Sequence, residues 1–221
     1  MSGKEGNKLV FIGDSGVGKT CIISRFTKNS FDTEENSTTG ASYAQKTIEI
    51  PETGETLDLN IWDTAGQERY KALTKIFFQG AKMAVLVYDI SVKKSYDNMK
   101  GEWLNILKEH GDPDIVKAVV GNKSDKYDEE AVPEQEAREF AKSIGAFFRL
   151  TSAKLGFGIN TLLNDLGKRY IDPNYIESDK DIPDDNKKVK KVNKKGRQRE
   201  NNGSQRLTSD KKNIKKNKKC C

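Results

Sequence analysis

Near its start the chain reads Lys8-Leu9-Val10-Phe11-Ile12-Gly13-Asp14-Ser15-Gly16-Val17-Gly18-Lys19-Thr20. The apolar residues before Gly13 predict a short strand, and the residues after it have the spacing Gly-x-x-x-x-Gly-Lys-Thr. Glycines at these positions let backbone N–H groups approach phosphate oxygens without interference from a Cβ atom. The stretch is therefore typical of a phosphate-binding P-loop.

The residues that follow the P-loop predict a helix over 18–28, because apolar side chains recur there at helical spacing. The positive end of the helix dipole would then face the phosphates. In this arrangement Lys19 contacts the β- and γ-phosphates, and the Thr20 hydroxyl binds Mg²⁺. The predicted nucleotide contacts in this stretch are Asp14, Ser15, Gly16, Val17, Gly18, Lys19, Thr20 and Cys21.

Strand patterns and helix patterns alternate from the P-loop to about residue 172. The predicted strands are 7–13, 47–50, 57–62, 83–88, 115–120 and 146–150, and the predicted helices are 18–28, part of 69–79, one capped by Ser95, 134–144 and 159–171. The strands 47–50 and 57–62 flank a turn and predict an antiparallel hairpin. The alternation predicts an α/β fold, with a mostly parallel six-stranded sheet, one antiparallel strand and helices on both faces.

Charge is distributed unevenly along the 221 residues, whose net charge is +6. From residue 187 to residue 219 there are 15 Lys and Arg residues and two acidic residues, so the rest of the chain is acidic. A segment so polar cannot offset the entropy lost on ordering. We therefore predict a folded domain over 1–172 and a disordered basic tail over 173–221.

The sequence shows no apolar run of the roughly 18 residues that a membrane span needs, and no signal peptide is evident at its start. The protein is therefore expected to be made in the cytosol and to stay there. Three cysteines, Cys21, Cys220 and Cys221, do not form a disulfide framework. Cys21 is expected to be buried on the helix after the P-loop.

A second polar segment, Asp63-Thr64-Ala65-Gly66-Gln67, follows the predicted strand 57–62. Asp63 would hold Mg²⁺ through its water shell. The N–H group of Gly66 could contact the γ-phosphate, and Gln67 could orient a water molecule for in-line attack on it.

Two further segments supply recognition of a base. Asn122-Lys123-Ser124-Asp125 follows a buried strand, and the Asp125 carboxylate can accept hydrogen bonds from N1–H and the 2-amino group of guanine. Thr151-Ser152-Ala153-Lys154 follows the last strand and offers the Ala153 N–H to guanine O6. The predicted contacts with the base and ribose are Asn122, Lys123, Asp125, Ser152, Ala153 and Lys154.

With these four motifs in order, residues 7–172 resemble a small GTPase of the Ras superfamily and, within it, the Rab family. The other segments that resemble the family are Thr39-Gly40-Ala41-Ser42-Tyr43, Leu59-Asn60-Ile61-Trp62, Arg69-Tyr70-Lys71-Ala72-Leu73-Thr74, Phe77-Phe78-Gln79-Gly80-Ala81 and Leu86-Val87-Tyr88-Asp89-Ile90-Ser91. The resemblance implies a P-loop G domain that binds GTP or GDP with Mg²⁺ and hydrolyses GTP to GDP. Hydrolysis would be slow without a GTPase-activating protein (GAP), because no motif places an arginine in cis at the γ-phosphate.

The resemblance also implies roles for individual residues. Gln67, Lys19 and Thr38 would be catalytic, and Thr38 would bind Mg²⁺ with Thr20 and Asp63 in the GTP state only. Phe31 would stack edge-on against guanine. The expected effector surface is aromatic and consists of Tyr43, Trp62 and Phe77.

The chain ends in Cys220-Cys221, which is similar to the double-cysteine end on which Rab proteins carry two geranylgeranyl groups. Two lipid chains and a basic tail would hold the protein on a membrane. The implied partners are an exchange factor, a GAP, a GDP-dissociation inhibitor and GTP-dependent effectors, with no nucleic acid and a monomeric chain. The implied location is the cytoplasmic face of endomembranes in vesicle trafficking, with cycling through the cytosol; the segment 40–43 favours the endosomal branch.

Two other classes of protein compete with this interpretation. A P-loop can also belong to a nucleotide kinase or an ATPase, although the Asn122-Lys123-Ser124-Asp125 segment favours guanine. A lysine-rich tail can also belong to a nucleic-acid-binding module. That second alternative leaves the four nucleotide motifs without a role.

Overall fold

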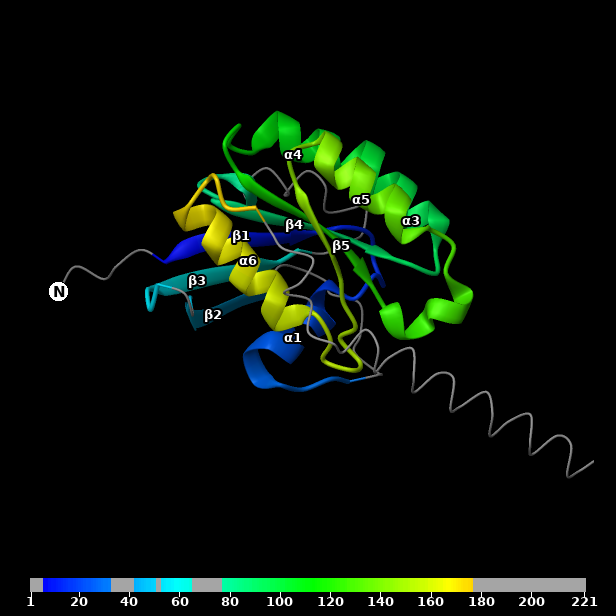
Figure 1. Ribbon diagram of the computed structural model, residues 1–221, viewed down its shortest axis with the longest axis horizontal. Helices are drawn as coiled ribbons and strands as arrows, with labels where there is room; N and C mark the ends of the chain where they lie inside the picture. The colour runs from blue at the N-terminus through cyan, green and yellow to red at the C-terminus, as the bar shows by residue number, and fades with distance from the viewer. Residues whose placement is uncertain (1–5, 33–41, 51–52, 65–76, 177–221) are drawn as a thin grey trace, which may run out of the picture. The chain divides into compact units, whose positions relative to one another are not determined.

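The computed structural model describes residues 6–32, 42–50, 53–64 and 77–176 (Figure 1). Its elements are β1 (Asn7–Ile12), α1 (Lys19–Lys28), β2 (Ser42–Glu49), β3 (Thr56–Asp63), β4 (Met83–Asp89), α3 (Lys93–Asn98), the π turn η2 (Met99–Trp103), α4 (Leu104–His110), β5 (Val116–Asn122), the 3₁₀ helix η3 (Ser124–Glu129), α5 (Glu134–Ser143), β6 (Phe147–Leu150) and α6 (Ile159–Ile171). The predictions for Thr38, Gly66, Gln67, Cys220 and Cys221 lie outside the described residues.

The six strands form one sheet in the order β2-β3-β1-β4-β5-β6. The pairs β1–β3, β1–β4, β4–β5 and β5–β6 are parallel, and only β2 runs antiparallel to its neighbour β3. The predicted α/β fold, mostly parallel and with one antiparallel strand, is therefore confirmed.

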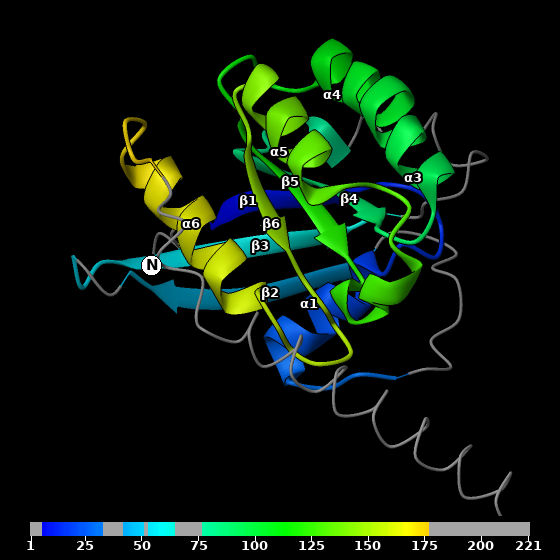
Figure 2. The same cartoon turned by 45° about the vertical axis from the view of Figure 1, so that its right-hand side comes forward.

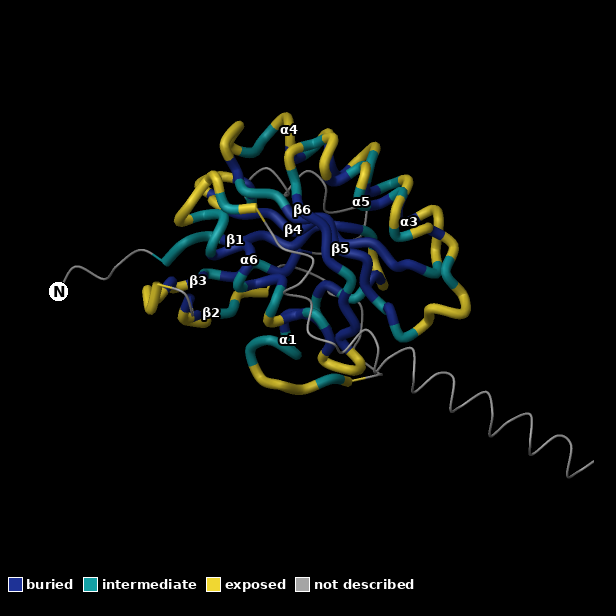
Figure 3. Tube along the Cα trace, viewed as in Figure 1, coloured by how far each residue is buried: buried dark blue, intermediate teal, exposed yellow. Residues whose placement is uncertain are grey.

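Helices cover both faces of the sheet (Figures 1 and 2). Helices α1 and α6 pack on one face, with Leu9 and Phe11 of β1 in the core beneath them. Helices α3, α4 and α5 pack on the other face, where the next residues along the strand, Val10 and Ile12, point. Successive side chains of a strand point to opposite faces, so a strand covered on both sides is apolar throughout. Figure 3 shows the resulting buried centre, and every residue of β4 belongs to it.

A glycine lets α6 lie close to the edge of the sheet. A Cβ atom added at Gly167 would lie 2.8 Å from Ile50 Cδ1 and 2.9 Å from Ile48 Cδ1. The absent side chain therefore leaves room for the two isoleucines beneath the helix.

The structure differs from the sequence prediction at β2 and at Ser95. Strand β2 begins at Ser42 rather than residue 47, because residues 42–46 lie on an edge strand where little is buried and no apolar alternation marks them. Helix α3 begins at Lys93, so Ser95 is not its N-cap. The Ser95 hydroxyl instead donates to the carbonyl of Val92 at 2.7 Å and accepts from the Asp89 N–H at 3.0 Å.

Among the described residues, no helix is both long and apolar enough to cross a membrane. The predicted boundary between domain and tail at residue 172 stays a prediction.

Candidate nucleotide-binding site

The polar motifs lie at the carboxyl end of the sheet. The P-loop connects β1 to α1, Asp63 ends β3, Asp89 ends β4, and Asn122 ends β5. Ligands of open α/β sheets bind at this edge. The fold therefore brings together motifs that are far apart in the sequence.

Two P-loop glycines are required by their surroundings as well as by their backbone. Gly13 has φ +145°, and a Cβ atom there would lie 2.2 Å from the carbonyl oxygen of Val87. Gly18 has φ +94°, and a Cβ atom there would lie 2.4 Å from Asn122 Nδ2. Other residues rarely adopt this backbone and could not fit. The loop thus lies close to β4 and β5, so the P-loop and the motif that begins at Asn122 can share one ligand.

Lys19 lies inside the curve of the P-loop and is only 5% exposed. Its ammonium group donates to the carbonyl oxygens of Gly13 and Asp14, at 2.9 Å each. Burial lowers the pKa of Lys19 to about 8, although the charges of Asp63 and Asp14 act to raise it. A cation so poorly solvated would gain strongly from a phosphate anion beside it.

Thr20 and Asp63, two of the three predicted Mg²⁺ ligands, lie side by side. The Thr20 hydroxyl donates to Asp63 Oδ2 at 2.6 Å. Across the ranges that the structure describes, no three His, Cys, Asp or Glu side chains gather to hold a metal ion. Mg²⁺ is commonly held by one or two protein oxygens, with phosphates and water completing its shell, so this pair fits it.

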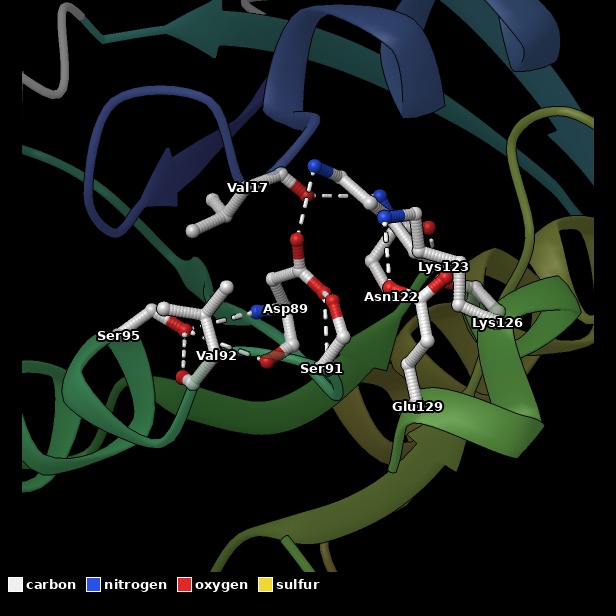
Figure 4. Close-up of polar contacts among 10 residues, drawn as sticks. Val17, Asp89, Ser91, Val92, Ser95, Asn122, Lys123, Lys126 and Glu129 are labelled. Carbon is white, nitrogen blue, oxygen red and sulfur yellow. Dashed lines mark hydrogen bonds and ion pairs between the residues drawn. The ribbon is translucent and has the colours of Figure 1, made fainter. Parts of the chain in front are cut away.

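Asn122 joins the base-recognition motifs to the P-loop (Figure 4). It is 1% exposed; its Nδ2 donates to the carbonyl of Val17 at 2.8 Å, and its Oδ1 accepts from the Thr151 hydroxyl at 3.1 Å. Asp125 is held in turn by the Ser152 hydroxyl, which donates to its Oδ1 at 2.6 Å. One amide therefore connects three of the four sequence motifs.

Lys123 is anchored by Asp89, a residue that the sequence analysis assigned no role. Lys123 has φ +63°, and its ammonium lies 2.8 Å from Asp89 Oδ2. Figure 4 marks this ion pair with a dashed line. Burial acts to raise the pKa of Asp89, but hydrogen bonds from Lys123 and Ser91 outweigh it and hold this pKa below its usual value. The sequence did hold a signal for the role of Asp89. An Asp at the end of a buried strand commonly accepts the backbone N–H of the residue two positions later, which here is Ser91.

Arg25 is a second residue whose role was not predicted. Its Nε donates to the carbonyl of Ala153 at 2.8 Å, and its Nη2 donates to that of Lys154 at 3.0 Å. Its guanidinium also lies 5.9 Å from the centre of the Phe31 ring. Arg25 thus links α1 to the last base-recognition motif and to the aromatic ring expected to stack on guanine.

A family model described as the Ras family matches residues 8–172. The chain belongs to the Ras family. It is 49% identical over 146 residues to Ras-related protein RGP2 of Oryza sativa subsp. japonica, a match that spans 66% of each chain. It is 44% identical over 161 residues to Ras-related protein Rab-10 of Caenorhabditis elegans, across 73% of this chain and 79% of the relative. These likenesses make it a Rab-like small GTPase, and GTPases of this family hydrolyse GTP to GDP.

The aromatic residues expected to bind effectors of this Ras-family chain form one cluster. The ring centres of Tyr43 and Trp62 are 5.4 Å apart, and those of Trp62 and Phe77 are 6.0 Å apart. Tyr43 is 50% exposed. A hollow of about 560 Å³ adjoins Tyr43 and Trp62.

One sequence prediction about this GTPase needs correction. Cys21 is half-buried rather than buried, because it lies on the flank of α1 and packs only against the margin of the core.

Proposed function

We propose that this chain is a GTP-dependent switch in membrane trafficking, which hydrolyses GTP to GDP and exposes an effector surface only in its GTP state. The observation that carries the proposal is the position of Asn122. Its amide touches both the P-loop and the last base-recognition motif, so phosphate recognition and base recognition belong to one site.

In this site we assign the phosphates to residues 14–20 and to Gly66, with Lys19 on the β- and γ-phosphates. Thr20, Asp63 through its water shell and, in the GTP state, Thr38 would hold Mg²⁺, whose charge would support transfer of the γ-phosphate. Guanine is recognised by Asn122, Lys123, Asp125, Ser152, Ala153 and Lys154, with Phe31 at its edge. The hydrogen bond from Thr20 to Asp63 supports the metal assignment.

The nucleotide preference distinguishes this function from a kinase, an ATPase or a nucleic-acid-binding module. We expect fluorescent GDP to bind tightly and fluorescent ADP more weakly by a factor on the order of 10⁴, because adenine lacks the two donors that Asp125 accepts. Titration of each nucleotide into the full chain, with Mg²⁺ and with excess chelator, measures this preference. Equal affinity for GDP and ADP would exclude a guanine-specific switch.

The hydrolysis step is assigned to Gln67, which orients the attacking water. Replacing Gln67 with Leu should slow single-turnover GTP hydrolysis by a factor on the order of 10 or more, and should abolish most stimulation by a GAP, which is worth about 10³–10⁵. Release of phosphate from preloaded protein, with and without a GAP, measures both effects.

Gln79→Leu is the matched control for this prediction, since it makes the same chemical change at an exposed residue beside β4. It should hydrolyse GTP at the parental rate. Parental hydrolysis by Gln67→Leu would remove Gln67 from the mechanism.

Switching and membrane attachment complete the proposal. Thr38 and Gly66 contact the γ-phosphate and release it after hydrolysis, so the surface around Tyr43, Trp62 and Phe77 changes with the nucleotide. Effectors, an exchange factor, a GAP and a GDP-dissociation inhibitor bind this chain in different states. Prenyl groups on Cys220 and Cys221, aided by the basic tail, attach it to endomembranes.

A further inference from the structure

Asp14 of the P-loop is held by two side chains, one from α3 and one from the π turn η2 that follows it. Its Oδ1 accepts from Trp103 Nε1 and its Oδ2 accepts from Asn98 Nδ2, at 2.7 Å each. Asn98 ends α3, and Trp103, which is 1% exposed, ends the π turn η2. We call these three residues the Asp14 clamp.

The π turn is what lets both donors reach one carboxylate. Asn98 and Trp103 are five residues apart, and in an α-helix of 3.6 residues per turn they would point about 140° apart. At the end of the turn the Leu104 N–H donates to the carbonyls of Gly101 and Met99, and Met99 lies five residues back. This wider turn brings residues five apart toward the same side of the helix, and single π turns inside helices are frequent at functional sites.

The clamp continues into the phosphate site. The carbonyl oxygen of Asp14 accepts from the ammonium of Lys19 at 2.9 Å. Asp14 is thus held through its carboxylate by α3 and η2, and it holds Lys19 through its backbone. A movement of the α3–η2 segment would therefore displace Asp14 and the carbonyl oxygen that contacts the Lys19 ammonium.

We propose that Asn98 and Trp103 are positioning residues, which fix the P-loop through Asp14 and thereby set the rate at which the nucleotide is released. The proposal rests on the function given above, because it concerns the same phosphate site. It adds a regulatory route, since any partner that moves the α3–η2 segment would change nucleotide release without touching the nucleotide.

The variants Trp103→Phe and Asn98→Ala test the clamp, because each removes one donor to the Asp14 carboxylate. A hydrogen bond to a charged group is a strong one, so we expect each variant to release fluorescent GDP about tenfold faster than the parent. The phosphorus NMR resonance of the β-phosphate of bound GDP should also shift. Asn98 is only half-buried, so its replacement keeps the test valid if Trp103→Phe fails to fold.

Tyr96→Phe is the matched control, because it removes a hydrogen bond from the same helix, between the Tyr96 hydroxyl and the Glu136 carbonyl at 3.3 Å, without touching the P-loop. It should release GDP within about twofold of the parental rate and leave the β-phosphate resonance in place. Equal acceleration in all three variants would indicate general loosening of the helix and overturn the clamp. If Asn98→Ala released GDP at the parental rate and left the β-phosphate resonance in place, the clamp would also be overturned, while the GTPase function would stand. Failure of the parent to bind GDP would overturn both proposals.

Discussion

Replacing Asp125 with Asn should lower the affinity for GDP by a factor on the order of 10⁴, the largest effect that we expect from a single substitution. The carboxylate accepts from two guanine donors, whereas an amide can present its own N–H groups to them. The Ser152 hydroxyl bonds Asp125 Oδ1 at 2.6 Å and so restricts how the new side chain could turn to avoid this. The substitution therefore leaves polar groups unpaired in the site.

Titration with fluorescent GDP and xanthosine diphosphate measures this effect. Xanthine carries a carbonyl where guanine carries its amino group, so the amide introduced by Asp125→Asn should favour it, and the preference should reverse. Asp128→Asn is the matched control, because it makes the same change at an exposed position of the same 3₁₀ helix, η3. A retained preference for GDP in Asp125→Asn would remove Asp125 from base recognition.

Features written in short stretches of sequence could be predicted. The P-loop was identifiable because the spacing of its glycines reflects local backbone needs, and φ at Gly13 and Gly18 is positive. Helix α6 has the predicted bounds, Ile159–Ile171, since its apolar face is continuous and Pro173 follows closely. The first half of β2 was missed, because an edge strand with exposed faces has no apolar periodicity.

Features that depend on distant contacts could not be predicted. Arg25 meets Ala153 across 128 residues, and Trp103 meets Asp14 across 89. Neither pair leaves a local pattern, since each depends on which helix covers which strand. The π turn also has no local sequence pattern, because residues 98–104 fit an ordinary helix until the contacts of Asn98 and Trp103 are known. The sequence therefore indicates the motifs that are expected to bind the nucleotide, but not the distant side-chain contacts that hold those motifs in place.

Replacing Lys19 with Met should lower the affinity for GDP by a factor on the order of 10²–10³, because it removes one partner of a buried charge pair and leaves the phosphates without it. The parent should also show a pH dependence that the variant lacks. Burial lowers the pKa of Lys19 to about 8, and a bound phosphate would raise it again. Above pH 8 the free protein must therefore take up a proton to bind GDP, and its affinity should fall by up to about tenfold per pH unit.

Calorimetric titration of GDP between about pH 7 and 9, in two buffers of different ionisation enthalpy, measures both the affinity and the proton uptake. Lys28→Met is the matched control, because Lys28 lies exposed at the other end of α1 and should keep the parental affinity and uptake. Ionisation of guanine itself is present in every variant, so only the uptake that disappears in Lys19→Met belongs to the lysine. Equal proton uptake by the parent and Lys19→Met would show that Lys19 is already fully charged before the phosphate arrives, and that its burial does not prepare the site for an anion.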